Sequence, residues 1–132
     1  MKRYYFVGER PSPTAMRRGW RWEHGRLAAK QLFDALLLIG INPSQCRFDN
    51  AFDTDSLARI RTAVRCDYVI VAMGKKCQQF LAEHAVPFLA LVHPAARGEI
   101  RRKDRYAAHV KIAVAVFSAR LATALAEMKA AS

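Results

Sequence analysis

Short runs of apolar residues alternate along the chain with longer stretches in which apolar residues recur at every third or fourth position. Apolar runs cover Arg3 to Val7, Tyr68 to Met73 and Phe88 to Val92, and a weaker run covers Cys46 to Phe52. Within the clearest runs the apolar residues are consecutive, which is typical of parallel strands covered on both faces. The pattern predicts four strands in a mainly parallel sheet.

The stretches between these runs predict helices. Leucines recur near helical spacing up to Gly40, and a glycine followed by an apolar residue such as Ile41 is typical of a helix C-terminus. The segment from Asp53 to Asp55 offers a cap for a second helix, and a third is expected from Lys75 to about Glu83. Helices that alternate with parallel strands predict an α/β fold, here a three-layer α/β/α sandwich.

The final stretch, from Asp104 onward, predicts one long helix. A stripe of its residues is apolar at spacings of three and four, and we expect this stripe to pack on the sheet. The stripe consists of Tyr106, Val110, Ala113, Phe117, Leu121, Leu125 and Met128.

The segment from Pro11 to Gly25 is rich in Pro, Gly, Ser and Arg and contains both tryptophans. We expect a loop here. A loop of this length in a small domain is typical of a functional region.

The composition is typical of one soluble globular domain. The chain has 132 residues, of which 52% are hydrophobic and 25% are charged, so a core can form but a second domain has little room. We therefore expect a single domain over residues 1–132. Lys and Arg number 22 against 11 Asp and Glu, a formal charge of +11. This excess favours a polyanionic partner, and nucleic acid is the first candidate.

Several other classes are disfavoured. The N-terminal residues include no apolar stretch of signal-peptide length, and no run approaches the ~20 residues of a membrane helix. The three cysteines, Cys46, Cys66 and Cys77, form no Cys-x-x-Cys pair, so neither a disulfide framework nor a zinc site is indicated. We expect a cytoplasmic monomer with no membrane partner, no metal and no cofactor.

Residues able to carry chemistry follow three of the predicted strands. Gly8-Glu9-Arg10-Pro11-Ser12 follows the first strand, Asn50 lies near the end of the second, and His93-Pro94 follows the last. The carboxyl ends of parallel strands and the helix N-termini beside them form the ligand crevice of open α/β sheets. We therefore expect these residues to share one site.

These motifs resemble those of the uracil-DNA glycosylase superfamily, in particular the branch whose first motif reads Gly-Glu-x-Pro-Gly and whose last reads His-Pro-Ser/Ala. The likeness runs from about Tyr4 to Arg102 and includes the order of the elements between the motifs. It implies a uracil-DNA glycosylase-like fold. It also implies a DNA glycosylase, which hydrolyses the N-glycosidic bond of uracil or a related damaged base flipped out of DNA.

The resemblance implies a role for each matching residue. His93 would donate a hydrogen bond to the leaving base as negative charge develops there, and Glu9 would hold the water and favour the sugar cation. Asn50 would offer a donor and an acceptor to the base edge in a bidentate pairing, and Trp22, in preference to Trp20, would stack on the base. The substrate-binding motif also includes Gly8, Pro11 and Ser12.

In this family the loop after the His-Pro motif enters a DNA groove. Ile100 would then wedge into the gap left by the extruded base, and the basic residues around it would contact phosphates. These basic residues are Arg97, Arg101, Arg102 and Lys103.

Three features depart from the family pattern. Arg10 stands where relatives have Asp, Asn or a small residue, and a guanidinium cannot serve as a base at neutral pH. The closest branch carries four cysteines for an iron–sulfur cluster, which three scattered cysteines cannot rebuild. The chain is also shorter than typical members, which puts loops that clamp the DNA in doubt.

Other interpretations stay open. The chain could be a non-catalytic DNA-binding module on the same fold that recognises uracil, abasic sites or DNA ends. It could also be an unrelated α/β protein that binds a nucleotide or phosphate at residues 8–12. Each site residue has a structural interpretation as well: Glu9 and Asn50 as turn residues, His93 as a strand end, and the tryptophans as a cap on the core.

A second alignment has to be weighed, because Gly40-Ile41-Asn42-Pro43-Ser44 resembles the Gly-Ile-Asn-Pro-Gly motif of the mismatch-specific branch of the same superfamily. Asn42 would then hold the water. Only about 50 residues would remain before His93, too few for the intervening strands and helices. We interpret the segment as an ordinary helix-ending turn.

Overall fold

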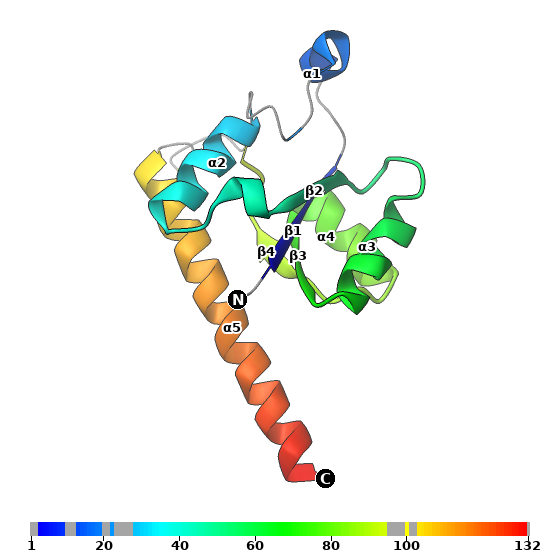
Figure 1. The fold of residues 1–132 in the computed structure, drawn as a ribbon, viewed down its shortest axis with the longest axis vertical. Helices are drawn as coiled ribbons and strands as arrows, with labels where there is room; N and C mark the ends of the chain where they lie inside the picture. Colours follow the sequence, from blue (N-terminus) through cyan, green and yellow to red (C-terminus); the bar gives the residue numbers. More distant parts are fainter. Residues whose placement is uncertain are drawn as a thin grey trace.

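The computed structural model describes residues 3–9, 13–19, 22, 28–94, 100 and 103–131. Figure 1 shows the order of the elements along the chain. They are β1 (Arg3–Gly8), α1 (Pro13–Arg18), α2 (Ala28–Leu38), the 3-10 helix η2 (Pro43–Gln45), β2 (Arg47–Asn50), α3 (Ser56–Arg65), β3 (Tyr68–Met73), α4 (Lys75–Glu83), β4 (Leu89–Leu91) and α5 (Lys103–Ala131).

The four strands form one sheet in the order β2-β1-β3-β4, and every pair in it is parallel. The predicted parallel sheet is thus confirmed, although β2 and β4 are shorter than the apolar runs suggested. At the carboxyl ends Gly8 lies opposite Asn50, and Met73 lies opposite Leu91. The segments that leave the strands therefore start from one edge of the sheet, which we call the carboxyl edge.

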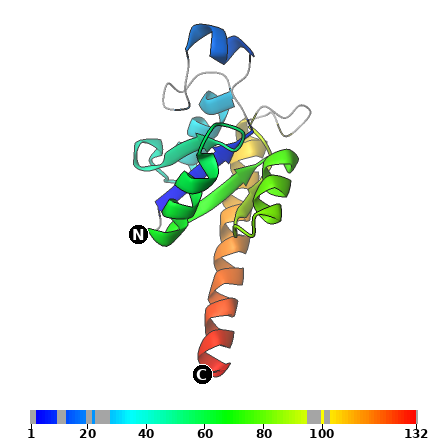
Figure 2. The same ribbon diagram turned by 90° about the vertical axis from the view of Figure 1, so that its right-hand side faces the viewer.

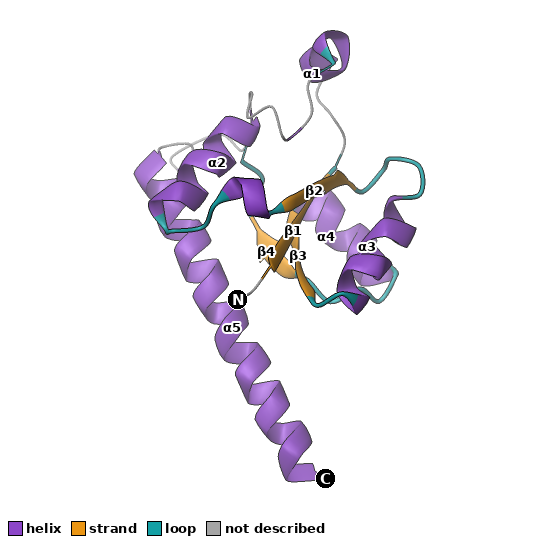
Figure 3. Ribbon diagram, in the orientation of Figure 1, coloured by secondary structure: helices purple, strands orange, loops and turns teal. Residues whose placement is uncertain are grey.

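Helices cover both faces of the sheet, as Figure 3 shows. Alternate residues of β1 point to opposite faces because side chains alternate along a strand. Tyr4 and Phe6 pack in one cluster with α2 and α5, and Tyr5 and Val7 pack in a second with α3 and α4. The predicted three-layer α/β/α arrangement is therefore confirmed.

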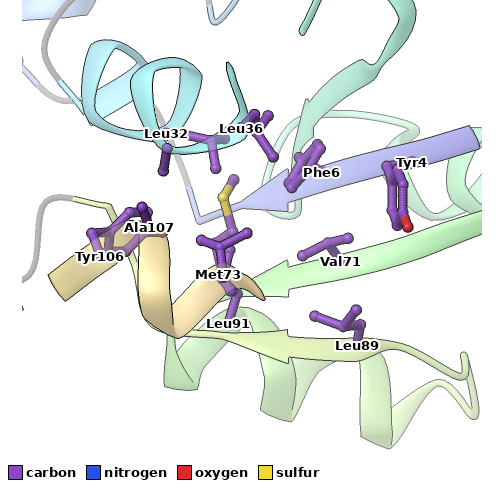
Figure 4. Close-up of a cluster of buried hydrophobic side chains, with 12 residues drawn as sticks. Tyr4, Phe6, Leu32, Leu36, Val71, Met73, Leu89, Leu91, Tyr106 and Ala107 are labelled. Atoms are coloured by element: carbon purple, nitrogen blue, oxygen red, sulfur yellow. The ribbon is translucent and has the colours of Figure 1, made fainter. Parts of the chain in front are cut away.

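The larger core cluster lies between the sheet and the helices α2 and α5, as seen in Figure 4. Leu32 and Leu36 of α2 are fully buried against strand residues such as Met73. Each such side chain contributes roughly 1.5 to 3 kcal/mol when it is removed from water. Tyr106 of α5, which is 1% exposed, packs in the same cluster on the same face of the sheet.

The end of α2 follows the predicted glycine signal. Gly40 adopts a left-handed φ of 82°, and the N–H of Ile41 donates to the carbonyl of Leu36 at 2.9 Å. This bond satisfies a carbonyl that the end of the helix leaves without a partner. The prediction of a glycine-terminated helix is confirmed.

The predicted cap of α3 is wrong in its chemistry. Asp55 occupies the position before the helix, but it has a left-handed φ of 62° and its side chain makes no capping hydrogen bond. The hydroxyl of Ser56 donates instead to the carbonyl of Ala51, which ties the start of α3 to the end of β2. The left-handed backbone at Asp55 is the physical reason, since a capping side chain needs an extended backbone to reach the helix N–H groups.

The described side chains of α5 that pack on the sheet lie in the first half of the helix. Tyr106 and Val110 are buried and Phe117 is partly buried, whereas Met128 is 68% exposed. Figure 2 shows the second half of the helix extending beyond the rest of the molecule. The prediction that the whole apolar stripe packs on the sheet is therefore wrong at Met128, because the helix is longer than the sheet it covers. The side chains of Leu121 and Leu125 lie outside the described residues.

The segment predicted as a loop from Pro11 to Gly25 contains the short helix α1, so the prediction of a loop throughout is wrong there. Met16, Arg17 and Arg18 of this helix are exposed. Within the described ranges, no helix combines the length and the apolar character needed to cross a membrane.

Candidate functional site

The indole of Trp22 lies where three segments that are distant in the sequence meet. Its Nε1 donates a hydrogen bond of 3.1 Å to Oδ1 of Asn50 at the end of β2. Its ring centroid lies 6.4 Å from that of His93, which follows β4. The indole also packs against Gly8 at the end of β1. We call Gly8, Trp22, Asn50 and His93 the Trp22 cluster.

Gly8 is a glycine because the indole approaches its backbone closely. A β carbon at this position would lie 2.9 Å from Cζ2 of Trp22 and 3.3 Å from Oδ1 of Asn50. Real β carbons essentially never approach another atom to 2.9 Å, so any larger residue would have to displace the indole. The glycine of the first sequence motif thus makes room for a side chain from elsewhere in the chain.

Trp22 also continues an aromatic stack that begins in the core. Its ring lies parallel to that of Phe48 at 6.2 Å and 19°, and Phe48 stacks in turn on Phe6 at 5.6 Å and 16°. One face of the half-buried indole is therefore covered by protein, which supports the interpretation of Trp22 as a cap on the core. Stacking of a base on its other face stays a prediction. Trp20 lies outside the described residues.

The bond from Trp22 fixes the orientation of the Asn50 amide. Because Oδ1 accepts from the indole, Nδ2 points to the other side, and the structure contains no hydrogen bond from Nδ2 to another described residue. The backbone of Asn50 is fixed as well, since its N–H donates to Oδ1 of Asp49 at 2.8 Å. The arrangement presents the amide as a hydrogen-bond donor.

A buried network behind Asn50 holds β2 in place. Asp49 is 7% exposed, accepts from the hydroxyl of Tyr5 at 2.6 Å and from two nitrogens of Arg59 at 2.9 Å each. Burial raises the pKa of Asp49, but the hydrogen bonds from Arg59 and Tyr5 outweigh it and leave the pKa below its usual value. The carboxylate therefore stays charged and keeps all its donors.

His93 is partly buried beside Glu9. Burial lowers the pKa of its imidazole, and the nearby charge of Glu9 opposes this effect only in part. The imidazole is therefore neutral at pH 7. It packs on Gly74, where a β carbon would lie 3.4 Å from the β carbon of His93. A neutral ring keeps one N–H donor.

Two residues of α5 fix the backbone next to His93. The hydroxyl of Tyr106 donates to the carbonyl of Val92 at 2.7 Å, and the N–H of Val92 donates to Nε2 of His109 at 3.0 Å. Burial lowers the pKa of His109, which keeps the ring neutral and Nε2 able to accept. In the sequence Tyr106 stands out only by its place in the apolar stripe, and nothing there links His109 to Val92. Only the fold brings both residues to Val92.

Glu9 has a cation beside it that sequence reasoning missed. Its Oε1 lies 3.5 Å from Nζ of Lys76, in the first turn of α4. The carbonyl of Glu9 accepts from the N–H of Phe52 at 3.1 Å, which ties the first motif to the end of β2. The carboxylate is also close enough to His93 to act on its pKa. No sequence signal links residue 76 to residue 9.

Cys77 lies near this carboxylate but cannot act as a nucleophile. It is fully buried, and its thiol donates to the carbonyl of Val7 at 3.2 Å. Burial, supported by the charge of Glu9, raises its pKa to about 12. The thiolate is therefore absent at neutral pH.

Several predicted site residues cannot be compared with the structure. Pro11, Ser12, Arg97, Arg101 and Arg102 lie outside the described residues. Lys103 begins α5, and its side chain lies outside the described part of the chain. Ile100 is half-buried and packs against the larger core cluster. Its role as a wedge in DNA stays a prediction.

The second alignment points to the opposite edge of the sheet. Oδ1 of Asn42 accepts from both the N–H and the hydroxyl of Ser44, at 3.0 and 2.8 Å, and so caps η2. This turn precedes β2, whereas Glu9 and His93 follow their strands. The position agrees with an ordinary helix-ending turn.

No protein-family model matches the chain, and a search of curated proteins found no significant match. In the part of the chain that the structure covers, no three His, Cys, Asp or Glu side chains lie close enough together to hold a metal ion.

Proposed function

We propose that the chain is a DNA glycosylase of the uracil-DNA glycosylase type, acting at the carboxyl edge of its sheet. The observation that carries the proposal is the meeting of Gly8, Asn50 and His93 at one indole. These residues belong to three separate sequence motifs that resemble those of the uracil-DNA glycosylase superfamily. The three-layer fold with its parallel sheet agrees with the proposed fold type, and the net charge of +11 suits DNA.

The reaction needs a hydrogen-bond donor beside the leaving base. Cleavage of the N-glycosidic bond leaves the bonding electrons on the base, so negative charge develops on its carbonyl oxygens. The neutral imidazole of His93 offers an N–H for that charge. The hydrogen bonds of Tyr106 and His109 fix the backbone of Val92, so the chain that carries this donor is held in place before the reaction starts. Such preorganisation favours electrostatic stabilisation.

Asn50 supports a preference for bases that carry an oxygen at the recognised edge. With one lone pair of Oδ1 taken by Trp22, the amide presents outward the two donors of Nδ2. Uracil offers a carbonyl oxygen at the position where cytosine has an amino group. A donor facing an amino group leaves both groups unpaired, which is the strongest basis for discrimination.

Glu9 would favour the positive charge that develops on the sugar and hold the attacking water. Its ion pair with Lys76 works against both tasks, since the ammonium partly offsets the carboxylate charge. This pair favours a second candidate, a non-catalytic module on the same fold that binds uracil, abasic sites or DNA ends.

The test is base release from labelled oligonucleotides that carry uracil opposite G, opposite A and in a single strand, with alkali revealing abasic sites. Strand breaks at uracil that disappear in His93→Ala and Glu9→Gln support the glycosylase. His84→Ala is the matched control, because His84 follows α4 at the opposite edge of the sheet and should leave the rate unchanged.

The same oligonucleotides separate the two candidates. Absence of product from every substrate contradicts the glycosylase. If uracil-containing strands are then bound more tightly than thymine-containing strands and Asn50→Ala removes the difference, the binding module is supported instead.

A further inference from the structure

A pair of arginines flanks one tyrosine at the amino edge of the sheet, opposite the Trp22 cluster. Arg3, Arg47 and Tyr68 are the first residues of β1, β2 and β3, which run parallel and therefore begin at the same edge. The guanidinium carbon of Arg3 lies over the Tyr68 ring, 4.4 Å from its centroid, and that of Arg47 lies 5.9 Å from it. We call Arg3 and Arg47 the amino-edge arginine pair.

Protein contacts fix both guanidinium groups. Arg3 donates from Nη2 to the carbonyl of Cys66 at 2.6 Å, and Arg47 donates from Nε to the hydroxyl of Tyr68 at 2.9 Å. Each contact uses one of the five N–H donors that an arginine carries. Both side chains are exposed, so the remaining donors face the solvent. The two guanidinium groups are therefore held in a fixed orientation before any ligand binds.

No described carboxylate neutralises this pair. The ion pairs among the described residues join Lys30 to Asp34, Arg59 to Asp49 and Lys76 to Glu9. Asp67 precedes Tyr68 in the chain but forms no ion pair with either arginine. Two like charges held against the same ring repel each other, and an anion bound between them would relieve that repulsion.

We propose that the amino-edge arginine pair binds the phosphodiester backbone of a nucleic acid, as a contact separate from the Trp22 cluster. Guanidinium groups match phosphate oxygens with two parallel hydrogen bonds, and stacking on an aromatic ring leaves those donors available. Arg65, at the end of α3 and three residues before Tyr68, adds a further exposed positive charge nearby. A polyanion is favoured over a single phosphate because the whole chain carries +11.

The test measures how binding to uracil-free oligonucleotides depends on salt. Each lost phosphate contact reduces the slope of log K against log salt by about one. In the variant Arg3→Gln/Arg47→Gln we expect the slope to fall by about two, and the affinity near 0.1 M salt to fall more than about tenfold. Lys111→Gln/Arg120→Gln is the matched control, since it removes two exposed charges from α5 and should keep the parent slope.

Single variants cover the case in which the double variant does not fold. Arg47→Gln leaves the stack of Arg3 on Tyr68 intact, and the slope should fall by about one. Tyr68→Phe keeps the ring and both charges but removes the hydroxyl that orients Arg47. It should weaken binding with little change in slope.

The proposal is overturned if the arginine variants and the charge-matched control show the same slope. It is also overturned if the arginine variants lose binding to vesicles of anionic phospholipid but keep binding to oligonucleotides, because the partner is then a membrane surface. The readout needs no base release. Failure of the proposed glycosylase therefore leaves this test unaffected.

Discussion

The indole N–H of Trp22 donates to Oδ1 of Asn50 across 28 positions of sequence, at 3.1 Å. The bond gives Trp22 a role that differs from stacking on a ligand, since it fixes which half of the amide faces outward. It also makes Asn50 dependent on a residue from the segment between β1 and α2. The two residues therefore have to be tested together.

Replacement of Trp22 by Phe keeps an aromatic ring on Phe48 but removes the donor to Asn50. We expect binding of uracil-containing strands, or their cleavage, to fall about fivefold, since one such hydrogen bond is worth about 1 kcal/mol. The measurement is a double-mutant cycle with Asn50→Ala. In the Asn50→Ala background Trp22→Phe should have no further effect. A full additional loss there would show that Trp22 acts through something other than the amide.

Gly8→Ala should displace the indole. The added β carbon would lie 2.9 Å from Cζ2 of Trp22, so we expect a loss of about 1 to 3 kcal/mol in the free energy of unfolding, as for overpacked cores. Denaturant unfolding measures this loss. Combining it with Trp22→Phe, whose ring is smaller, should recover part of it. If the losses in the free energy of unfolding of the two single variants instead simply add in the double variant, the close approach of the indole is not the reason for the glycine.

Stability should fall as the pH drops from about 7 toward 5. Burial lowers the pKa of both His93 and His109, so in this range the unfolded chain, with a histidine pKa near 6.5, binds protons that the folded chain does not. The free energy of unfolding then decreases with each step toward acid. His93→Gln and His109→Gln should each flatten the dependence, and the double variant should flatten it further. An unchanged slope in both would contradict the neutral imidazoles.

Removal of Arg59 should leave the buried carboxylate of Asp49 without its main partner. We expect Arg59→Gln to cost about 2 to 3 kcal/mol at pH 7, less than for a fully buried pair because the Arg59 side chain is 46% exposed. Lys30→Gln breaks an exposed pair with Asp34 and should cost less than about 0.5 kcal/mol.

The cost of losing Arg59 should depend on pH in a defined direction. The pKa of Asp49 is lowered in the folded protein, so its stabilising contribution is present above the unfolded pKa near 3.9 and is lost as the pH falls through the folded pKa. Unfolding curves of the parent and of Arg59→Gln should therefore converge in acid. A difference that stays constant down to pH 2 would mean that the charge of Asp49 is not involved.

Much of the fold follows from local patterns. The runs at Arg3 to Val7 and Tyr68 to Met73 predicted strands, and Lys75 to Glu83 predicted a helix with the observed bounds. These features depend on neighbours one to four positions apart, which the sequence displays directly. The capping of α3 was missed because it depends on the left-handed backbone of Asp55, which no spacing reveals.

The sequence by itself determined which residues follow the strands, and hence that Gly8, Glu9, Asn50 and His93 would gather at one edge of a parallel sheet. Only the tertiary structure decided what lies against them: the indole of Trp22 on Gly8, Lys76 beside Glu9, and Tyr106 and His109 on the backbone before His93. The reason is physical. Strand ends are set by hydrophobic runs within the chain, whereas these contacts join residues 14 to 67 positions apart, and packing of the helices on the sheet brings them together.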